Sequence, residues 1–103
     1  MADGLPYQVS WGSEAQALVK ELLRDARNPL ARAELARTIR GLNDQLKRDP
    51  RGVGVVYQVT GVIEERLATV DSIRALFAVD TERNYVAVRT CHALWRGNGK
   101  VPE

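Results

Sequence analysis

The sequence predicts an α+β domain in which two N-terminal helices form a hairpin and pack on a small twisted antiparallel sheet. Two observations predict this class. Apolar residues recur at helical spacing up to Asp49, and from Gly52 onward they alternate or run continuously, as in strands. The expected element order is therefore β-α-α-β-β-β, with residues 1–6 and 97–103 as loose tails. A chain of 103 residues is long enough for one core only, so residues 1–103 form a single domain.

The first half of the chain predicts a short strand and two helices. "YQVSW" at residues 7–11 alternates large apolar and small polar side chains, which is the period of a half-buried strand. Ser13 and Gln16 have the spacing of a capping box, and predict a helix from Glu14 to Ala26. Asn28 and Pro29 predict the start of a second helix, which Asp49-Pro50 ends. A short connection makes these helices an antiparallel hairpin.

The second half predicts a meander of three antiparallel strands at residues 62–69, 72–79 and 85–92, with a possible edge strand at Val55–Val59 before them. The middle strand is apolar at both parities except for Arg74, which is typical of a central strand covered on both faces. Gly52 and Gly54 fit neither the dinucleotide fingerprint nor the P-loop spacing, so we expect them to shape a turn and not to bind phosphate.

The composition excludes several classes of protein. No apolar run approaches the roughly 20 residues of a membrane span, and the first residues lack an export signal, so we expect a cytoplasmic protein without a membrane partner. One cysteine and one histidine exclude an internal disulfide and make a metal site unexpected, and no cofactor is predicted. Fifteen basic against thirteen acidic residues give a net charge of +2, which matters only where the basic residues cluster.

Three segments carry a resemblance to a known family. "YQVSWGSEAQALVKEL", "LKRDPRGVG" and "IRALFAVDTERNYVAVRTCH" resemble the RelE/ParE superfamily of toxins from bacterial toxin-antitoxin pairs, over roughly Tyr7 to His92. The most specific piece runs from Arg74 to Val79. In mRNA-cleaving members an arginine opens this segment and a histidine follows eighteen residues later, as His92 follows Arg74 here.

The resemblance implies a toxin that stops translation by cleaving mRNA on the ribosome, silenced by a cognate antitoxin in a hetero-oligomer. Two alternatives stay open, because the family also contains inhibitors of DNA gyrase and a degenerate member could bind a partner only. Two departures favour these alternatives. Ala93 stands where mRNA-cleaving members often carry tyrosine, and Val55 lies where their catalytic glutamate is expected.

Cleavage of RNA needs a base for the 2′-hydroxyl, cations for the phosphorane and an acid for the leaving 5′-oxygen. His92 suits the acid because imidazole titrates near neutrality. Arg74 and Arg66 suit the phosphate because a guanidinium binds two oxygens at once. Glu64 shares the strand parity of Arg66 and is the candidate base.

The register of the last hairpin decides which residue lies beside Arg74. A turn centred on Glu82 would place Arg74 opposite Thr90 and diagonal to His92, whereas a two- or four-residue turn would place Arg89 beside Arg74. Further candidate RNA contacts are basic residues near the last strand and at the end of the second helix: Arg89, Arg96, Lys47, Arg48 and Arg51.

Overall fold

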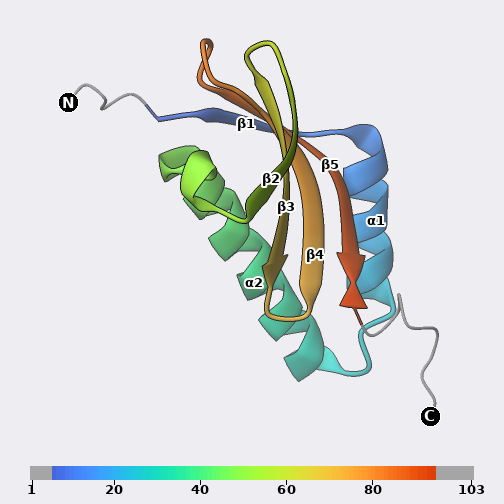
Figure 1. Ribbon diagram of the computed structural model, residues 1–103. Helices are drawn as coiled ribbons and strands as arrows, with labels where there is room; N and C mark the ends of the chain where they lie inside the picture. Colours follow the sequence, from blue (N-terminus) through green and yellow to red (C-terminus); the bar gives the residue numbers. More distant parts are fainter. Residues whose placement is uncertain (1–5, 95–103) are drawn as a thin grey trace.

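The computed structural model describes residues 6–94, and in this range two helices pack on a five-stranded sheet (Figure 1). The strand order is β1-β5-β4-β3-β2. The α+β class and the helical hairpin are confirmed, but the sheet is mixed and not fully antiparallel. Strand β1 (Gln8–Trp11) pairs in parallel with β5 (Tyr85–Ala93). After β1 the Gly12 amide donates to the carbonyl of Val88, and the chain turns directly into a helix beside β5.

Helix α1 (Ser13–Arg24) begins one residue before its predicted start, and its predicted capping box is absent. Gly12 occupies the N-cap position, which places Ser13 inside the helix and leaves Gln16 Nε2 to donate to the carbonyl of Trp11 at 2.7 Å. Helix α2 (Pro29–Arg48) begins as the sequence predicts. Asn28 Oδ1 accepts from the Ala31 amide at 2.8 Å, with proline in the first turn.

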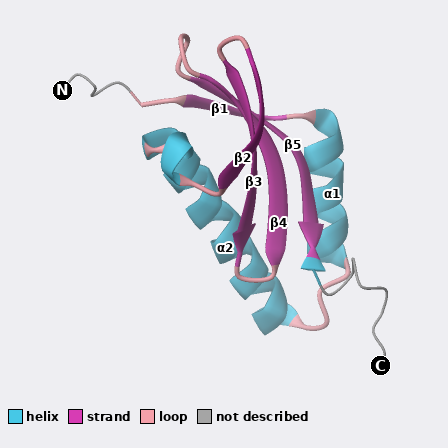
Figure 2. Ribbon diagram, in the orientation of Figure 1, coloured by secondary structure: helices cyan, strands magenta, loops and turns pink. Residues whose placement is uncertain are grey.

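The meander is confirmed and extends to four antiparallel strands. A 3₁₀ turn η1 (Pro50–Gly52) leads from α2 into the edge strand β2 (Val55–Thr60). Strands β3 (Ile63–Val70), β4 (Ile73–Asp80) and β5 follow, joined by short turns (Figure 2). All six residues of β2 are exposed, in contrast to the central strand β4.

Both helices cover the same face of the sheet, here called the helix face. Leu42 and Leu46 of α2 and Ala15 of α1 form one core with Phe77 and Val79 of β4. The opposite face, here called the open face, carries the exposed Arg74 and His92. The prediction that β4 is covered on both sides is therefore wrong for the described residues, because Leu76 and Ala78 are sheltered on the open face without a helix over them.

Candidate functional site

The open face brings together the two residues that the sequence singles out. Arg74 of β4 is the direct register partner of His92 of β5. Residues directly opposite in an antiparallel pair have Cβ atoms about 4.5–5.5 Å apart and project to the same face. The eighteen-residue spacing thus becomes a side-by-side pair. The sequence leaves the register open between two alternatives. The observed register places Arg74 and His92 on one face, although the partner of Arg74 is His92 itself and neither Thr90 nor Arg89.

A β-bulge in β5 produces this register. The turn between β4 and β5 holds four residues, because Asp80 pairs with Tyr85, and the pairing continues to Phe77 with Val88. Extended without a bulge, it would set Arg74 opposite Cys91 and turn His92 to the helix face. The register shifts between Leu76 and Phe77, where β5 contains one additional residue, Arg89. That residue restores the parity of His92.

Arg74 and His92 are both exposed, and among the described residues neither forms an ion pair or a side-chain hydrogen bond within the chain. Asp71, in the neighbouring turn, instead accepts a hydrogen bond from Thr38 Oγ1 at 3.0 Å and so faces α2. The guanidinium and the imidazole are therefore accessible to a ligand on the open face.

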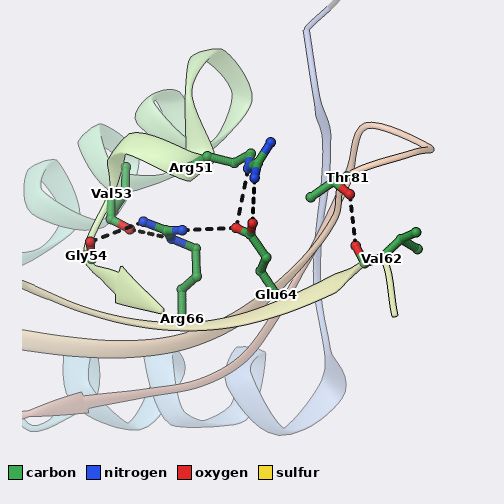
Figure 3. A network of polar contacts seen from close by, with 7 residues as sticks. All are labelled: Arg51, Val53, Gly54, Val62, Glu64, Arg66 and Thr81. Atoms are coloured by element: carbon green, nitrogen blue, oxygen red, sulfur yellow. Dashed lines mark hydrogen bonds and ion pairs between the residues drawn. The ribbon is translucent and has the colours of Figure 1, made fainter. Parts of the chain in front are cut away.

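Glu64 and Arg66 lie on the helix face and do not join Arg74 and His92. Glu64 pairs with Val79 and Arg66 with Phe77, both of them core residues. Arg66 is 7% exposed. It donates from Nε to the Val53 carbonyl at 3.0 Å, from Nη2 to the Gly54 carbonyl at 3.2 Å and from Nη1 to Glu64 Oε1 at 3.0 Å (Figure 3). Each of the three nitrogens of the buried guanidinium thus donates to an acceptor of the chain itself.

Glu64 also binds a second arginine. Arg51 Nη2 of η1 donates to Glu64 Oε2 at 2.6 Å, so the carboxylate bridges an exposed and a buried guanidinium (Figure 3). The hydrogen bond from Arg51 is the main cause that lowers the pKa of Glu64, and the same contact raises the pKa of Arg51. A carboxylate held charged in this way is a poor proton acceptor, which favours a structural role for Glu64.

Gly54 completes this network through its backbone. Its φ is +69°, and a Cβ added there would lie 2.3 Å from the Leu67 carbonyl oxygen. Only glycine tolerates both conditions, since other residues adopt this region at a cost and would clash with β3. The glycine therefore serves the close approach of this loop to β3, as expected for a turn.

The structure places the two positions at which the sequence departs from the mRNA-cleaving proteins that it resembles. Ala93 is 1% exposed and packs with Leu22, Ile73 and Cys91 on the helix face, so a side chain at this position cannot stack on a base at the open face. Val55 is the register partner of Leu67, and Leu67 lies in the row next to Thr69, Arg74 and His92. The place of the missing carboxylate is therefore apolar.

The basic candidates are divided between different parts of the molecule. Lys47 and Arg48 are exposed at the end of α2, and Arg51 is bound to Glu64 beside them. Arg89 alone joins the open face. Arg96 lies outside the described residues. A continuous basic track from α2 to Arg74 is thus not formed by the described part of the chain.

Sequence reasoning missed two residues of the open face, Tyr57 and Glu65. Tyr57 Oη donates to Glu65 Oε1 at 3.3 Å, and Arg89 Nη2 lies 3.6 Å from Glu65 Oε2. The alternation of β3 held a signal for Glu65. Glu64 and Arg66 continue in phase to Ala68 and Val70, which marks their face as the core side, so Glu65 belongs to the opposite face.

Two other classes of site find no support in the described range. Within residues 6–94 no helix is long and apolar enough to span a membrane, and no three metal-ligating side chains gather in one place. Burial raises the pKa of the Cys91 thiol to about 11. This thiol is therefore protonated at neutral pH, which makes it a poor nucleophile.

Known proteins match this chain in structure but not in sequence. No protein-family model matches the chain, and no curated protein matches it in sequence. A chain of the archaeal RelE-RelB complex from Pyrococcus horikoshii superposes with a TM-score of 0.68 at 15% identity, over 87% of this chain and 97% of that one. The chain has a RelE/ParE-type fold.

Two further solved structures support this assignment of the RelE/ParE-type fold. A chain of the RelBE2 toxin-antitoxin complex from Mycobacterium tuberculosis gives a TM-score of 0.63 at 20% identity, over 87% of this chain and 93% of that one. A chain of a chromosomal ParDE system from P. aeruginosa gives 0.66 at 12% identity, over 85% and 96%. Both names of the superfamily are thus represented among the structural neighbours.

Proposed function

We propose that this chain is the toxin of a toxin-antitoxin pair and that it cleaves mRNA on the ribosome through the open face of its sheet. The RelE/ParE-type fold supports the toxin, since its structural neighbours come from toxin-antitoxin complexes. The observation that carries the nuclease is the register pairing of Arg74 with His92. Both side chains are exposed on one face, where a phosphate can contact them together.

In this proposal Arg74 holds the scissile phosphate and His92 is the general acid. The 2′-oxygen attacks phosphorus, the bond to the 5′-oxygen breaks, and the imidazolium of His92 gives its proton to that leaving oxygen. The Arg74 guanidinium stabilises the additional negative charge of the phosphorane with two parallel hydrogen bonds. No metal ion takes part in this scheme.

The proton of the 2′-hydroxyl goes to solvent within the ribosomal site. Glu64, the candidate base, lies on the helix face and is bound to two arginines. Glu65 is on the correct face but lies four residues along β3 from Thr69, the partner of Arg74, which is roughly 13 Å. We therefore give Glu64 and Arg66 a structural role and leave catalysis to Arg74 and His92.

The partner in this proposal is a cognate antitoxin that forms a hetero-oligomer with the chain, and the site of action is the cytoplasm. The neighbouring structures are complexes of a toxin with an antitoxin, which supports a partner of that kind here. An adjacent reading frame that encodes a small acidic protein, and growth rescue by that protein, would support this pairing.

A second candidate is a toxin that binds DNA gyrase without catalysis. Two observations favour it. Val55 is apolar where an acid is expected, and Ala93 is buried on the helix face, so position 93 offers no aromatic ring for a base at the open face. In that case the open face is a protein-binding surface. His92 is then dispensable for chemistry.

Expression without antitoxin tests both candidates. We expect growth arrest by the wild-type chain, with translation stopping before DNA synthesis and new 5′ ends on ribosome-bound messages. His92→Gln should slow cleavage by roughly 10²–10⁴-fold, which is the usual contribution of a positioned proton donor. Arg74→Lys should also slow cleavage, because an ammonium cannot form the two parallel hydrogen bonds of a guanidinium with the phosphate.

Arg40→Ala is the matched control, because it removes one exposed cation from α2 and leaves the open face intact. It should arrest growth like the wild type. Early induction of the DNA damage response with intact messages would refute the proposed nuclease and support the proposed gyrase inhibitor. Normal growth in the presence of soluble, folded wild-type protein would refute both kinds of toxin.

A further inference from the structure

Two β-bulges point to a second site on the open face. In β2 the register shifts between Val56 and Gln58, which leaves Tyr57 as an additional residue, and in β5 the additional residue is Arg89. Both side chains reach the same carboxylate, that of Glu65 on β3. Bulges redirect side chains and are concentrated near functional sites. Two bulges that converge on one group are therefore informative.

These three residues, here called the bulge cluster, are held in place but remain accessible. Tyr57 is 50% exposed, and the side chains of Arg89 and Glu65 are 52% and 20% exposed. Glu65 pairs with Ala78 of β4, so the Arg89 guanidinium reaches this carboxylate from β5 across the intervening strand β4. In the row of Glu65, β4 presents only the small side chain of Ala78.

Structural bracing alone does not account for the bulge cluster. Each bulge interrupts the hydrogen-bond ladder of its strand pair. A partly exposed ion pair with a separation of 3.6 Å, such as Arg89–Glu65, contributes about 0–1 kcal/mol, which is little compared with two interruptions of the ladder. The cluster also lies on the same face as Arg74 and His92, and no helix of residues 6–94 covers that face.

We propose that the bulge cluster is a nucleobase subsite that selects an RNA base carrying an amino group, next to the nucleotide whose phosphate lies at Arg74 and His92. This inference rests on the proposed function. The subsite would determine sequence preference and would not take part in the cleavage step.

Each residue of the bulge cluster has a function that fits a base. The exposed ring of Tyr57 offers a stacking surface, which is the common way in which proteins hold single-stranded bases. At 3.6 Å, the Arg89 contact with Glu65 Oε2 is longer than a hydrogen bond, so this oxygen keeps capacity to accept from an amino group. Arg89 can bind the adjoining phosphate with its remaining N–H groups.

The distance between the two sites suits neighbouring parts of one strand of RNA. Glu65 and the Arg74–His92 row are roughly 13 Å apart along β3. Leu67 and Leu76, which are register partners between them, form a half-buried apolar floor. A single strand that lies along β3 and β4 can therefore contact both sites.

Binding of two short RNAs to the purified chain tests the subsite without the ribosome. Hexacytidylate and hexauridylate differ at C4 of the base. Cytosine carries an amino group there, which can donate to a glutamate, whereas uracil carries a carbonyl, which cannot. By fluorescence anisotropy we expect the wild-type chain to bind hexacytidylate roughly tenfold more tightly, within the range for one well-placed base contact.

Three variants assign the effect. Glu65→Gln should reduce the preference to about twofold or less, because its amide also donates to the carbonyl of uracil. Tyr57→Ala should weaken both RNAs, whereas Tyr57→Phe should keep the wild-type affinity through its ring. Glu82→Gln, which removes an exposed carboxylate in the β4–β5 turn, is the matched control and should change neither affinity.

The outcomes separate this proposal from the nuclease. Equal affinities of the wild-type chain for the two RNAs, no measurable binding of either, or a preference that survives Glu65→Gln would each overturn the subsite. A preference that Glu65→Gln abolishes, in a chain that cleaves no message, would uphold the subsite and refute the nuclease. Cleavage in cells with equal affinities would do the reverse.

Discussion

Arg66 and Arg74 lie on neighbouring strands of one sheet, and the two faces of that sheet give their guanidinium groups opposite surroundings. Arg66 is buried on the helix face, where two backbone carbonyls and Glu64 accept its hydrogen bonds. Arg74 is exposed on the open face beside His92 and has no ion pair among the described residues. One arginine thus stabilises the fold on the helix face, and the other is available to a ligand on the open face.

This difference teaches how the two arginines can be told apart. A buried guanidinium must be satisfied by the chain, because leaving it unpaired is costly, so the acceptors that surround all three nitrogens of Arg66 indicate a structural role. An exposed guanidinium needs no acceptor from the chain and keeps its donors for a phosphate. The contrast between these two residues is open to direct measurement.

The largest expected effect on stability is that of Arg66→Ala. Removing this side chain leaves the Val53 and Gly54 carbonyls without their donor and Glu64 without its buried partner. We expect a loss of about 3 kcal/mol in the free energy of unfolding, measured by urea denaturation. Arg74→Ala, the matched variant on the open face, should change it by less than about 0.5 kcal/mol. Equal losses in the two variants would contradict the comparison.

A smaller loss is expected where the backbone approaches the buried network. Gly54→Ala introduces a Cβ at φ +69° and 2.3 Å from the Leu67 carbonyl oxygen, and should lower the free energy of unfolding by about 2 kcal/mol. Gly41→Ala is the contrasting control. Nothing lies within 4 Å of a Cβ at Gly41 inside α2, so this change should stabilise the chain by about 0.5–1 kcal/mol. A neutral Gly54→Ala would show that the loop does not need glycine.

The smallest effect concerns the pH dependence of Glu64. Its pKa lies below the ordinary 4.5, chiefly because Arg51 donates to it, so the folded state releases this proton more readily than the unfolded chain. The resulting stability is complete above about pH 4.5 and is lost as the pH falls through the lower pKa of the folded state. Glu64→Gln should therefore be less stable than the wild type at pH 7.

The free energies of unfolding of the wild type and Glu64→Gln should then converge as the pH falls from 5 toward 3. Urea denaturation repeated across this range measures both. The exposed Glu34→Gln serves as the control for the other carboxylates and should run parallel to the wild type. A constant difference between Glu64→Gln and the wild type at all pH values would show that the carboxylate contributes nothing through its charge.

Local sequence signals predicted most elements of the fold, and they failed where two signals competed. Asn28 with Pro29 predicts the start of α2 correctly, since a cap needs only its own neighbouring amides. Ser13 with Gln16 has an equally good spacing, but the helix begins one residue earlier. The Gly12 amide is bound to Val88 across the sheet, and the Gly12 carbonyl accepts from the Gln16 amide, so Gly12 is the cap. A contact distant in sequence therefore overrode a local motif.

For the candidate site, the sequence by itself determined which candidate side chains are present and that they lie on strands. Arg74, His92, Arg66 and Glu64 all stand in segments whose pattern predicts β-structure, and the eighteen-residue spacing of the first pair is visible without coordinates. The alternation of β3 also separates Glu64 from Glu65, because side chains in a strand alternate between two faces.

Only the tertiary structure decided which of these residues meet. The turn of four residues would have turned His92 away from Arg74, and the bulge at Arg89 reversed that outcome. A bulge depends on how two strands twist and pack together, so the local sequence pattern does not predict it. The face that the helices cover was likewise decided by packing, and that choice buried Arg66 and left Arg74 exposed.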